Sequence, residues 1–174
     1  VFADDRGLPR MSVTPTGGGP ESNERRNRRI QATREEIKAA AWTQIARQGA
    51  SSLSLRAIAA SIGLTAPALY RYFPGKGDLV TALVVEAYES LADSLDLALA
   101  RLPGAQPDWR QGLRELGRAY RDWARQRPAA FYIIFGDPIP GYQAPATEVM
   151  APAARTLQGL IVVLGAAHQA GDLC

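Results

Sequence analysis

Apolar residues recur every three or four positions along most of the chain, which is the spacing of amphipathic helices. The pattern predicts a first helix over residues 33–48, in which Thr33 and Glu36 have the spacing of a capping box. Gly49 supplies a stop for this helix. No stretch alternates between apolar and polar residues across a hairpin turn, so the sequence predicts an all-α protein.

Three further helices are predicted in the first part of the chain. The second opens at Ser54, and the third runs from Thr65 to Tyr72, with Gly63 as the break between them. A long fourth helix covers about residues 78–101, because apolar side chains form a continuous stripe there. Residues 1–23 are rich in proline and glycine, show no apolar period and are expected to be disordered.

Three more helices complete the pattern. An amphipathic helix begins at Trp109 and ends near Arg127, and a short apolar helix covers residues 128–135. The last helix covers residues 146–169 and is apolar almost all round. We therefore expect other helices to surround it.

The charge is distributed unevenly along the 174 residues. Residues 1–77 hold 12 basic and 6 acidic side chains, whereas residues 78–174 hold 8 and 11. A basic first part points to a polyanionic partner such as nucleic acid. Arginines that simply face solvent explain the same count.

Cysteine and histidine are scarce, with Cys174 and His168 as the single examples. A single cysteine cannot form a disulfide scaffold, and one cysteine and one histidine leave almost nothing for a zinc site. The sequence therefore predicts no metal or cofactor. The longest uninterrupted apolar stretch, residues 160–167, is too short for a membrane span, and the start of the chain lacks the order of a signal peptide. These features predict a soluble cytoplasmic protein with no membrane partner.

The most informative segment is residues 55–73, which has the pattern of a helix-turn-helix. Ala59 supplies the small residue that two crossing helices need, and Gly63 supplies a backbone able to take positive φ. Leu69 returns an apolar side chain from the second helix to the core. Any two short helices joined by a glycine share part of this pattern, but the three features together favour a DNA-binding motif.

This part of the chain resembles the TetR-type (TetR/AcrR) transcriptional regulators over about residues 33–83. The resemblance is carried by Ser54-Leu-Arg-Ala-Ile-Ala, by Ala68-Leu-Tyr-Arg-Tyr-Phe-Pro-Gly-Lys and by a long helix that starts at Asp78. It implies a three-helix DNA-binding domain, here residues 24–77, followed by a helical domain for ligand binding and dimerisation, here residues 78–174. Typical members repress transcription and leave DNA when a small molecule binds.

Family members usually end with two further helices that build the dimer interface. The sequence stops soon after the seventh predicted helix, so we expect a chain truncated at its C-terminus that exposes an apolar surface.

Ten residues in and around the second and third helices are candidate DNA contacts: Ser54, Arg56, Thr65, Ala66, Pro67, Ala68, Tyr70, Arg71, Tyr72 and Lys76. The small residues at the start of the third helix allow close approach to base edges in the major groove. The two tyrosine hydroxyls suit phosphate oxygens, and Arg71 suits a phosphate or a base edge. Arg56 and Ser54 suit further contacts to the DNA backbone. The resemblance implies a phosphate contact for Lys76, just before the fourth helix. The alternative for the two tyrosines is packing against neighbouring helices, and for Arg71 and Lys76 it is a solvated face.

Four arginines, Arg25, Arg26, Arg28 and Arg29, precede the first predicted helix. They suit an arm that follows the minor groove or the phosphates. A disordered run that only improves solubility has the same composition.

Eight side chains of the second domain are candidates for a ligand pocket: Tyr88, Trp109, Tyr120, Trp123, Phe131, Tyr132, Phe135 and His168. Aromatic residues at helical spacing also suit an ordinary core, and a satisfied core histidine is the simpler interpretation of His168. The sequence lacks a phosphate-binding loop, Gly-x-Ser-x-Gly and His-Glu-x-x-His, so we do not expect an enzyme.

These observations predict a regulator that binds double-stranded operator DNA as a homodimer and is released by a small apolar or aromatic ligand. The alternative is a helical small-molecule carrier or protein-interaction module with an incidental basic end. A nucleic-acid-modifying enzyme is disfavoured because catalytic motifs are missing.

Overall fold

The computed structural model describes residues 20–102 and 108–172. Within these ranges every regular element is helical, which confirms the all-α prediction. The elements are α1 (Pro20–Gln48), η1 (Ala50–Ser52), α2 (Leu55–Ser61), α3 (Ala66–Tyr70), α4 (Lys76–Ala100), α5 (Trp109–Gln126), α6 (Pro128–Phe135) and α7 (Ala146–Gln169).

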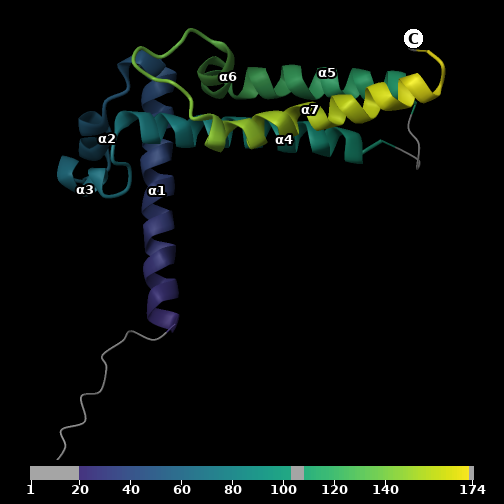
Figure 1. Cartoon of the computed structure of the whole chain (residues 1–174). Coiled ribbons are helices and arrows are strands. Elements are labelled where there is room, and N and C mark those ends of the chain that lie inside the picture. The colour runs from purple at the N-terminus through teal and green to yellow at the C-terminus, as the bar shows by residue number, and fades with distance from the viewer. Residues whose placement is uncertain (1–19, 103–107, 173–174) are drawn as a thin grey trace, which may run out of the picture.

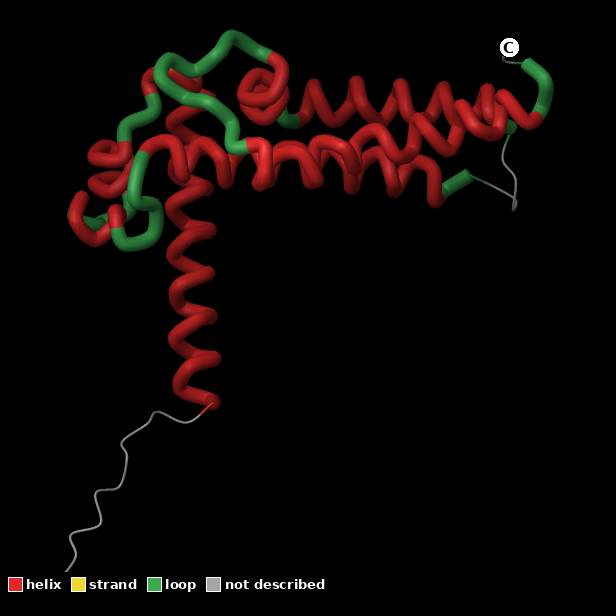
Figure 2. Tube along the Cα trace, in the orientation of Figure 1, coloured by secondary structure: helices red, strands yellow, loops and turns green. Residues whose placement is uncertain are grey.

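The helices form two units joined by α4. Helices α4, α5 and α7 run side by side as a bundle, and α6 lies near the end of this bundle that is closer to α1 (Figure 1). Helix α1 stands nearly at right angles to the bundle, and α2 and α3 lie beside it at the same end. In Figure 2 the long helices dominate the trace, with loops mostly at the two ends of the bundle.

The N-terminal unit consists of α1–α3 and the first turns of α4, packed around one core. Its large apolar side chains are almost completely buried, among them Ile37, Ile58, Leu69, Phe73 and Leu79. The predicted domain boundary at residue 77 lies at the start of α4, and the next apolar residues of that helix belong to this core. The two units therefore share one continuous helix.

A second core fills the bundle between α4, α5, α6 and α7. Two glycines let these helices approach closely: a Cβ atom at Gly112 would lie 2.9 Å from Val163, and one at Gly159 would lie 2.9 Å from Leu99. Larger residues at either position would push α7 away from its neighbours.

The predicted start of the first helix was wrong. Helix α1 begins at Pro20, so residues 20–23 are helical and not disordered, while residues 1–19 lie outside the described part. Thr33 is in the middle of the helix, where its hydroxyl donates to the Arg29 carbonyl at 3.1 Å, and the expected capping box does not form. Periodicity could not find this extension because the added turns have no apolar face, although arginine, glutamate and alanine are good helix formers.

The expectation for α7 was wrong in a different way. Its boundaries are as predicted, but other helices cover one side of it only, through Gly159, Val163 and Ala167. Ile161 and Met150 are each 66% exposed, so much of the apolar circumference faces solvent.

By length and composition, α7 could also cross a membrane, because it contains an 18-residue window of mean hydropathy 1.5, of which 11% is buried. The shorter uninterrupted apolar stretch, residues 160–167, predicts no membrane span. One such helix is weak evidence for a membrane span, and α7 lies along α4 and α5.

Candidate nucleic-acid interface

The turn between α2 and α3 has the geometry that the sequence predicts. Gly63 has φ of +71°, a conformation that favours glycine, and the Leu64 amide donates to the Ala59 carbonyl at 2.8 Å. Ala59 is buried where the two helices meet. Ser54 caps α2 by accepting a hydrogen bond from the Ala57 amide at 3.4 Å. The helix-turn-helix is therefore present as expected.

Helix α3 turns one side into the core and the other outward. The Thr65 hydroxyl oxygen accepts from the Ala68 amide at 3.3 Å and caps the helix, and Pro67 lies in the first turn, where its missing N–H costs nothing. Leu69 is fully buried, whereas Thr65 and Pro67 are exposed and Ala66 is half-buried. The helix ends at Tyr70, two residues before the predicted end.

The two candidate tyrosines lie in different surroundings. Tyr70 is 50% exposed, and Arg71 beside it is also exposed, so both are accessible to a partner. Tyr72 is half-buried and packs against the N-terminal core. Packing therefore explains part of the position of Tyr72 but not that of Tyr70.

Lys76 is the first residue of α4 and not, as predicted, a residue that precedes it. Its ammonium group donates to the Ser51 carbonyl at 3.1 Å, which brings the start of α4 close to η1. On α2, Arg56 is exposed next to the capping residue Ser54. The N-terminal unit thus presents positive groups from α2, from the end of α3 and from the start of α4.

Arg34 connects α1 to the chain that leaves α3, a role that sequence reasoning missed. Its guanidinium donates to the Tyr72 carbonyl at 2.6 Å and stacks over the Phe73 ring, 4.3 Å from the ring centre. The partners are separated by 38 residues, so no local pattern signals the contact.

A polar junction joins α1 to α4 further along. Lys38 pairs with Glu35 at 2.8 Å and with Glu86 at 2.7 Å, and the Trp42 indole donates to the other oxygen of Glu86 at 3.0 Å. Burial alone would lower the pKa of Lys38, but hydrogen bonds to Glu35 and Glu86 outweigh burial and raise it. This junction was also missed, because Trp42 and Glu86 are 44 residues apart.

Five of the predicted pocket residues meet in one aromatic cluster, which we call the α4–α6 aromatic cluster: Tyr88, Tyr120, Phe131, Tyr132 and Phe135. Their ring centres are 5.3–6.5 Å apart, mostly edge to face. Tyr132 is 66% exposed and Phe135 48%, so the cluster reaches the surface. Burial raises the pKa of Tyr88, the innermost of the three phenols in the cluster.

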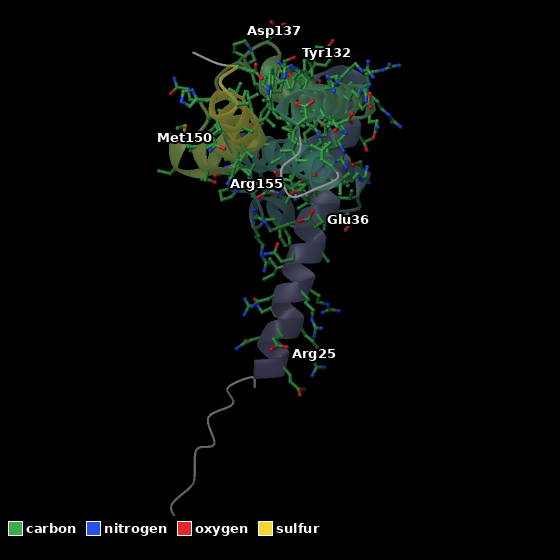
Figure 3. The ribbon with its side chains drawn as sticks, turned by 90° about the vertical axis from the view of Figure 1, so that its right-hand side faces the viewer. Arg25, Glu36, Tyr132, Asp137, Met150 and Arg155 are labelled. Carbon is green, nitrogen blue, oxygen red and sulfur yellow. The ribbon has the colours of Figure 1, made fainter. Side chains whose placement is uncertain are left out.

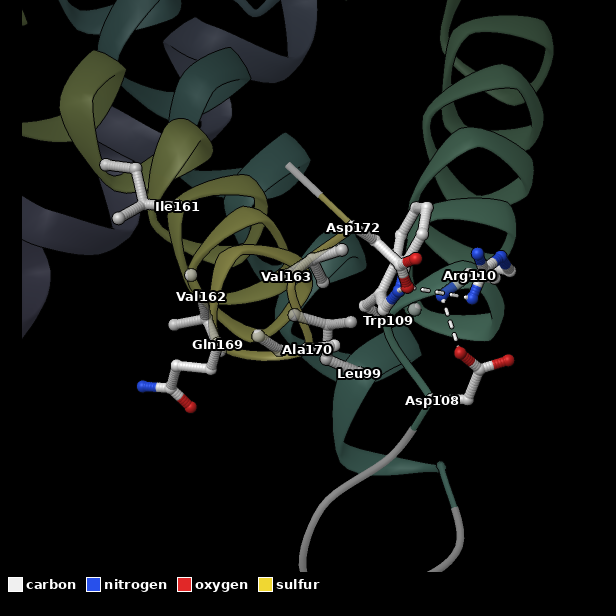
Figure 4. Close-up of a pocket in the computed structure, with 13 residues that line it drawn as sticks. Leu99, Asp108, Trp109, Arg110, Ile161, Val162, Val163, Gln169, Ala170 and Asp172 are labelled. Atoms are coloured by element: carbon white, nitrogen blue, oxygen red, sulfur yellow. Dashed lines mark hydrogen bonds and ion pairs between the residues drawn. The ribbon is translucent and has the colours of Figure 1, made fainter. Parts of the chain in front are cut away.

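The other three candidates lie apart from this cluster. Trp109 lines an open groove of about 900 Å³ at the far end of the bundle, where its indole donates to Asp172 at 2.9 Å (Figure 4). Trp123 is buried and donates to the Ser90 hydroxyl at 3.1 Å, which is an ordinary core arrangement. His168 is exposed on α7, so the interpretation as a core histidine was wrong, because that side of α7 is uncovered.

Two family models match the chain. The model for bacterial regulatory proteins of the tetR family matches residues 37–83, and a tetracyclin repressor-like C-terminal domain matches residues 113–173. The first match covers the helix-turn-helix and the first turns of α4, and the second covers most of α5 to α7. Both match the units that the structure defines.

Curated relatives point the same way. The HTH-type transcriptional regulator Rv1816 of Mycobacterium tuberculosis and its counterpart Mb1846 of Mycobacterium bovis are each 36% identical over 130 residues. The match covers 75% of this chain and 55% of each relative, so the chain spans about half the length of the curated relatives it matches.

Solved structures share the fold. The regulatory protein SCO4313 superposes with a TM-score of 0.71 at 40% identity, over 84% of this chain and 71% of that one. The TetR family transcriptional regulator PfmR from Thermus thermophilus superposes with a TM-score of 0.61 at 17% identity, over 79% and 72%. The second similarity shows the fold alone.

Proposed function

The chain belongs to the tetR family of bacterial regulatory proteins, and from this premise we propose that it regulates transcription by binding double-stranded operator DNA. The single observation that carries the proposal is the helix-turn-helix, with an outward α3 that is capped by Thr65 and held by buried Leu69. We propose no catalytic role, and we place the activity in the cytoplasm, where operator DNA is found.

In the proposed complex the start of α3 enters the major groove. Thr65, Ala66, Pro67 and Ala68 are small, so the helix can approach base edges closely, and the alanine and proline carbons suit thymine methyl groups. Thr65 uses its hydroxyl oxygen as an acceptor in the cap, which leaves its proton for a base or a phosphate. This part of the interface supplies sequence selection.

Phosphate contacts come from the surrounding residues. Tyr70 is the last residue of α3, and Arg71 and Tyr72 follow it directly. Arg56 belongs to α2, and Ser54 caps the start of that helix. The Lys76 ammonium has three N–H donors, of which one is used by the Ser51 carbonyl. Another can therefore donate to a phosphate of the DNA backbone. These contacts position the protein without reading sequence.

The test is an electrophoretic shift with the DNA upstream of the protein's own gene, at two salt concentrations and against an unrelated duplex of equal length. Salt-sensitive retention that prefers the upstream DNA supports the proposal. Lys76→Ala and Tyr72→Phe are expected to weaken binding to both duplexes alike, with a salt slope that is lower by about 1 for the lysine variant. Equal retention of both duplexes by the native chain would instead favour the carrier or interaction module.

We further propose that a small apolar or aromatic ligand controls DNA binding from the α4–α6 aromatic cluster. The cluster of five rings reaches the surface through Tyr120, Tyr132 and Phe135, which offer stacking and edge contacts to such a molecule. Tyr88 belongs to α4, the same helix whose first turns pack in the N-terminal core. A ligand that tilts α4 therefore changes where α3 is held.

In a homodimer this tilt would alter the spacing of the two recognition helices. We expect the dimer to protect a pseudo-palindromic operator whose half-sites are about 34–36 Å apart or more. A ligand can release DNA only by binding the free protein more tightly than the operator complex. Titration of 8-anilinonaphthalene-1-sulfonate, as an apolar aromatic probe, into protein with and without operator DNA tests this coupling. Equal affinities in the two titrations would exclude it.

A further inference from the structure

The first turns of α1 project from the molecule as a separate feature. Every side chain from residue 21 to residue 32 is exposed, and at 1.5 Å per residue this stretch is about 18 Å long. Figure 3 shows Arg25 near the end of this projection, far from Tyr132 and Asp137 at the other end of the molecule. We call residues 21–32 the α1 extension. No other described helix covers it, so its chemistry faces outward.

The α1 extension is rich in arginine. It contains two glutamates and four arginines, Arg25, Arg26, Arg28 and Arg29. Arg25 pairs with Glu21 at 3.5 Å in an exposed contact. At 100° per residue, Arg25 and Arg29 lie almost in line along the helix, with Arg26 on one side and Arg28 on the other. The four guanidinium groups therefore share one broad face, in an array that the helix holds in register.

The position of the extension is fixed relative to α3. Arg34, two residues beyond its end, is bound to the Tyr72 carbonyl and stacked on Phe73, directly after the recognition helix. Ile37 and Ala41 then anchor the same helix in the N-terminal core. The basic array is thus a rigid continuation of the unit that carries α3, on a different side of α1 from Arg34.

We propose that the α1 extension is a second DNA contact, which binds phosphates outside the base pairs read by α3. This inference rests on the proposed function and names a part of the interface that lies outside the helix-turn-helix. Guanidinium groups bind phosphate oxygens with paired hydrogen bonds, and duplex DNA offers a phosphate about every 3.4 Å along each strand. Because a helix fixes the backbone from which the arginines project, the array loses less conformational entropy on binding than a disordered arm would.

The chemistry favours DNA over an acidic protein surface for two reasons. The extension has no apolar face to form the centre of a protein interface, and Ile30 is the single large apolar residue in it. It is also attached to a helix-turn-helix, which would hold it close to any duplex that α3 engages.

The test compares two variants of equal charge. In the first variant, glutamine replaces the four arginines of the α1 extension. In the second variant, glutamine replaces four exposed arginines of α5, namely Arg114, Arg118, Arg121 and Arg125. Each variant loses four positive charges and keeps long, helix-compatible side chains. Operator affinity is measured as a function of salt, hydroxyl-radical footprints are recorded, and circular dichroism checks that both variants are folded.

The extension variant is expected to bind operator at least about tenfold more weakly at physiological salt, with a salt slope reduced by about 2–3, because each lost phosphate contact contributes about 0.9. Its footprint should lose protection outside the α3 half-site, while the α5 variant keeps both the slope and the footprint. Unchanged binding by the extension variant, or equal losses in both variants, would overturn the inference. If the native chain shows no selective binding to DNA, the proposed function itself fails.

Discussion

The two units at either end of α4 differ in how completely they bury their own apolar side chains. The N-terminal unit encloses its large apolar residues, and Tyr70 and Ile30 are its exposed exceptions among the described residues. In the bundle of α4–α7, eleven large apolar or tyrosine side chains are exposed, six of them on α7. The N-terminal unit, whose core also includes Ile139 from the segment between α6 and α7, therefore leaves little apolar surface uncovered, whereas the bundle has more apolar surface than its own helices cover.

This difference fits the two proposed roles, DNA binding by the N-terminal unit and ligand binding by the bundle. A body that reads DNA must hold α3 rigidly, and close packing around Leu69 and Phe73 provides that rigidity. A body that binds ligands or other helices needs accessible apolar surface, and the α4–α6 aromatic cluster and α7 provide it. The following predictions test this contrast with matched substitutions.

The largest effect is expected from one substitution made in both units. Ile58→Ala removes a side chain that is 1% exposed and should lower the free energy of unfolding by about 2–5 kcal/mol. Ile161→Ala removes a side chain that is 66% exposed and should change it by about 0.5 kcal/mol or less. Chemical denaturation followed by circular dichroism measures both. A comparable cost at Ile161 would show that α7 is covered in solution and would remove the contrast.

Glycine substitutions in the two units should give the next largest difference in stability, with a loss at Gly63 and a gain at Gly165. Gly63→Ala forces a side chain into a conformation with φ of +71° and should cost about 1–2 kcal/mol, and Gly63→Val should cost more. Gly165→Ala in α7 meets nothing within 4 Å and should stabilise the helix by about 0.5–1 kcal/mol. Thermal melting of the three variants checks this order. A Gly63→Val variant that melts with the native protein would contradict the role assigned to the turn.

The accuracy of the sequence-based predictions follows the same division. The helix-turn-helix could be predicted because Ala59, Gly63 and Leu69 lie within 11 positions, so local geometry fixes their roles. The boundaries of α6 and α7 were also correct, since proline, glycine and apolar spacing define them locally.

The environment of α7 could not be predicted, because hydropathy gives the amount of apolar surface and not the neighbours that cover it. The same limit applies to contacts across long sequence separations, such as Trp42 with Glu86. The α1 extension lacked any apolar period, so only helix propensity could have indicated it. Of the candidate site, the outward position of Thr65 and Tyr70 could be predicted, whereas the roles of Arg34 and Lys38 could not.

Two cations that each bridge a pair of carboxylates sharpen the comparison further. Lys38 joins α1 to α4 with a side chain that is 16% exposed, and Lys38→Met should lower stability by about 1–2 kcal/mol, between the values for exposed and buried pairs. Arg155 bridges Asp93 and Asp96 at 2.6 Å on the exposed side of the bundle, and Arg155→Met should have no measurable effect in about 0.5 M salt.

The stabilisation by Lys38 also has a defined pH range. Its pKa is raised in the folded protein, so its contribution is fully present below the ordinary value of 10.5 and is lost as the pH rises through the folded pKa. The difference between native protein and Lys38→Met should therefore be constant at neutral pH and disappear in strong alkali. A difference that persists there would show that packing and not charge is responsible.

The smallest expected effect concerns the far end of the bundle, where Asp172 connects the end of α7 to the start of α5. The Trp109 indole donates to its carboxylate at 2.9 Å and Arg110 pairs with it at 3.1 Å, and these contacts lower the pKa of Asp172 below 3.8. The contribution of this contact is thus present above pH 3.8 and is lost as the pH falls through the lower, folded pKa.

Trp109 fluorescence should report this change as an acid transition below pH 3.8. Asp172→Asn should remove the transition. Trp109→Phe should remove the fluorescence change that reports it, while Trp42 and Trp123 continue to emit. Far-UV circular dichroism that stays constant over the same pH range separates a local change from unfolding. If Asp172→Asn keeps the transition at the same pH, other carboxylates cause it, and the end of α7 is not held by this contact.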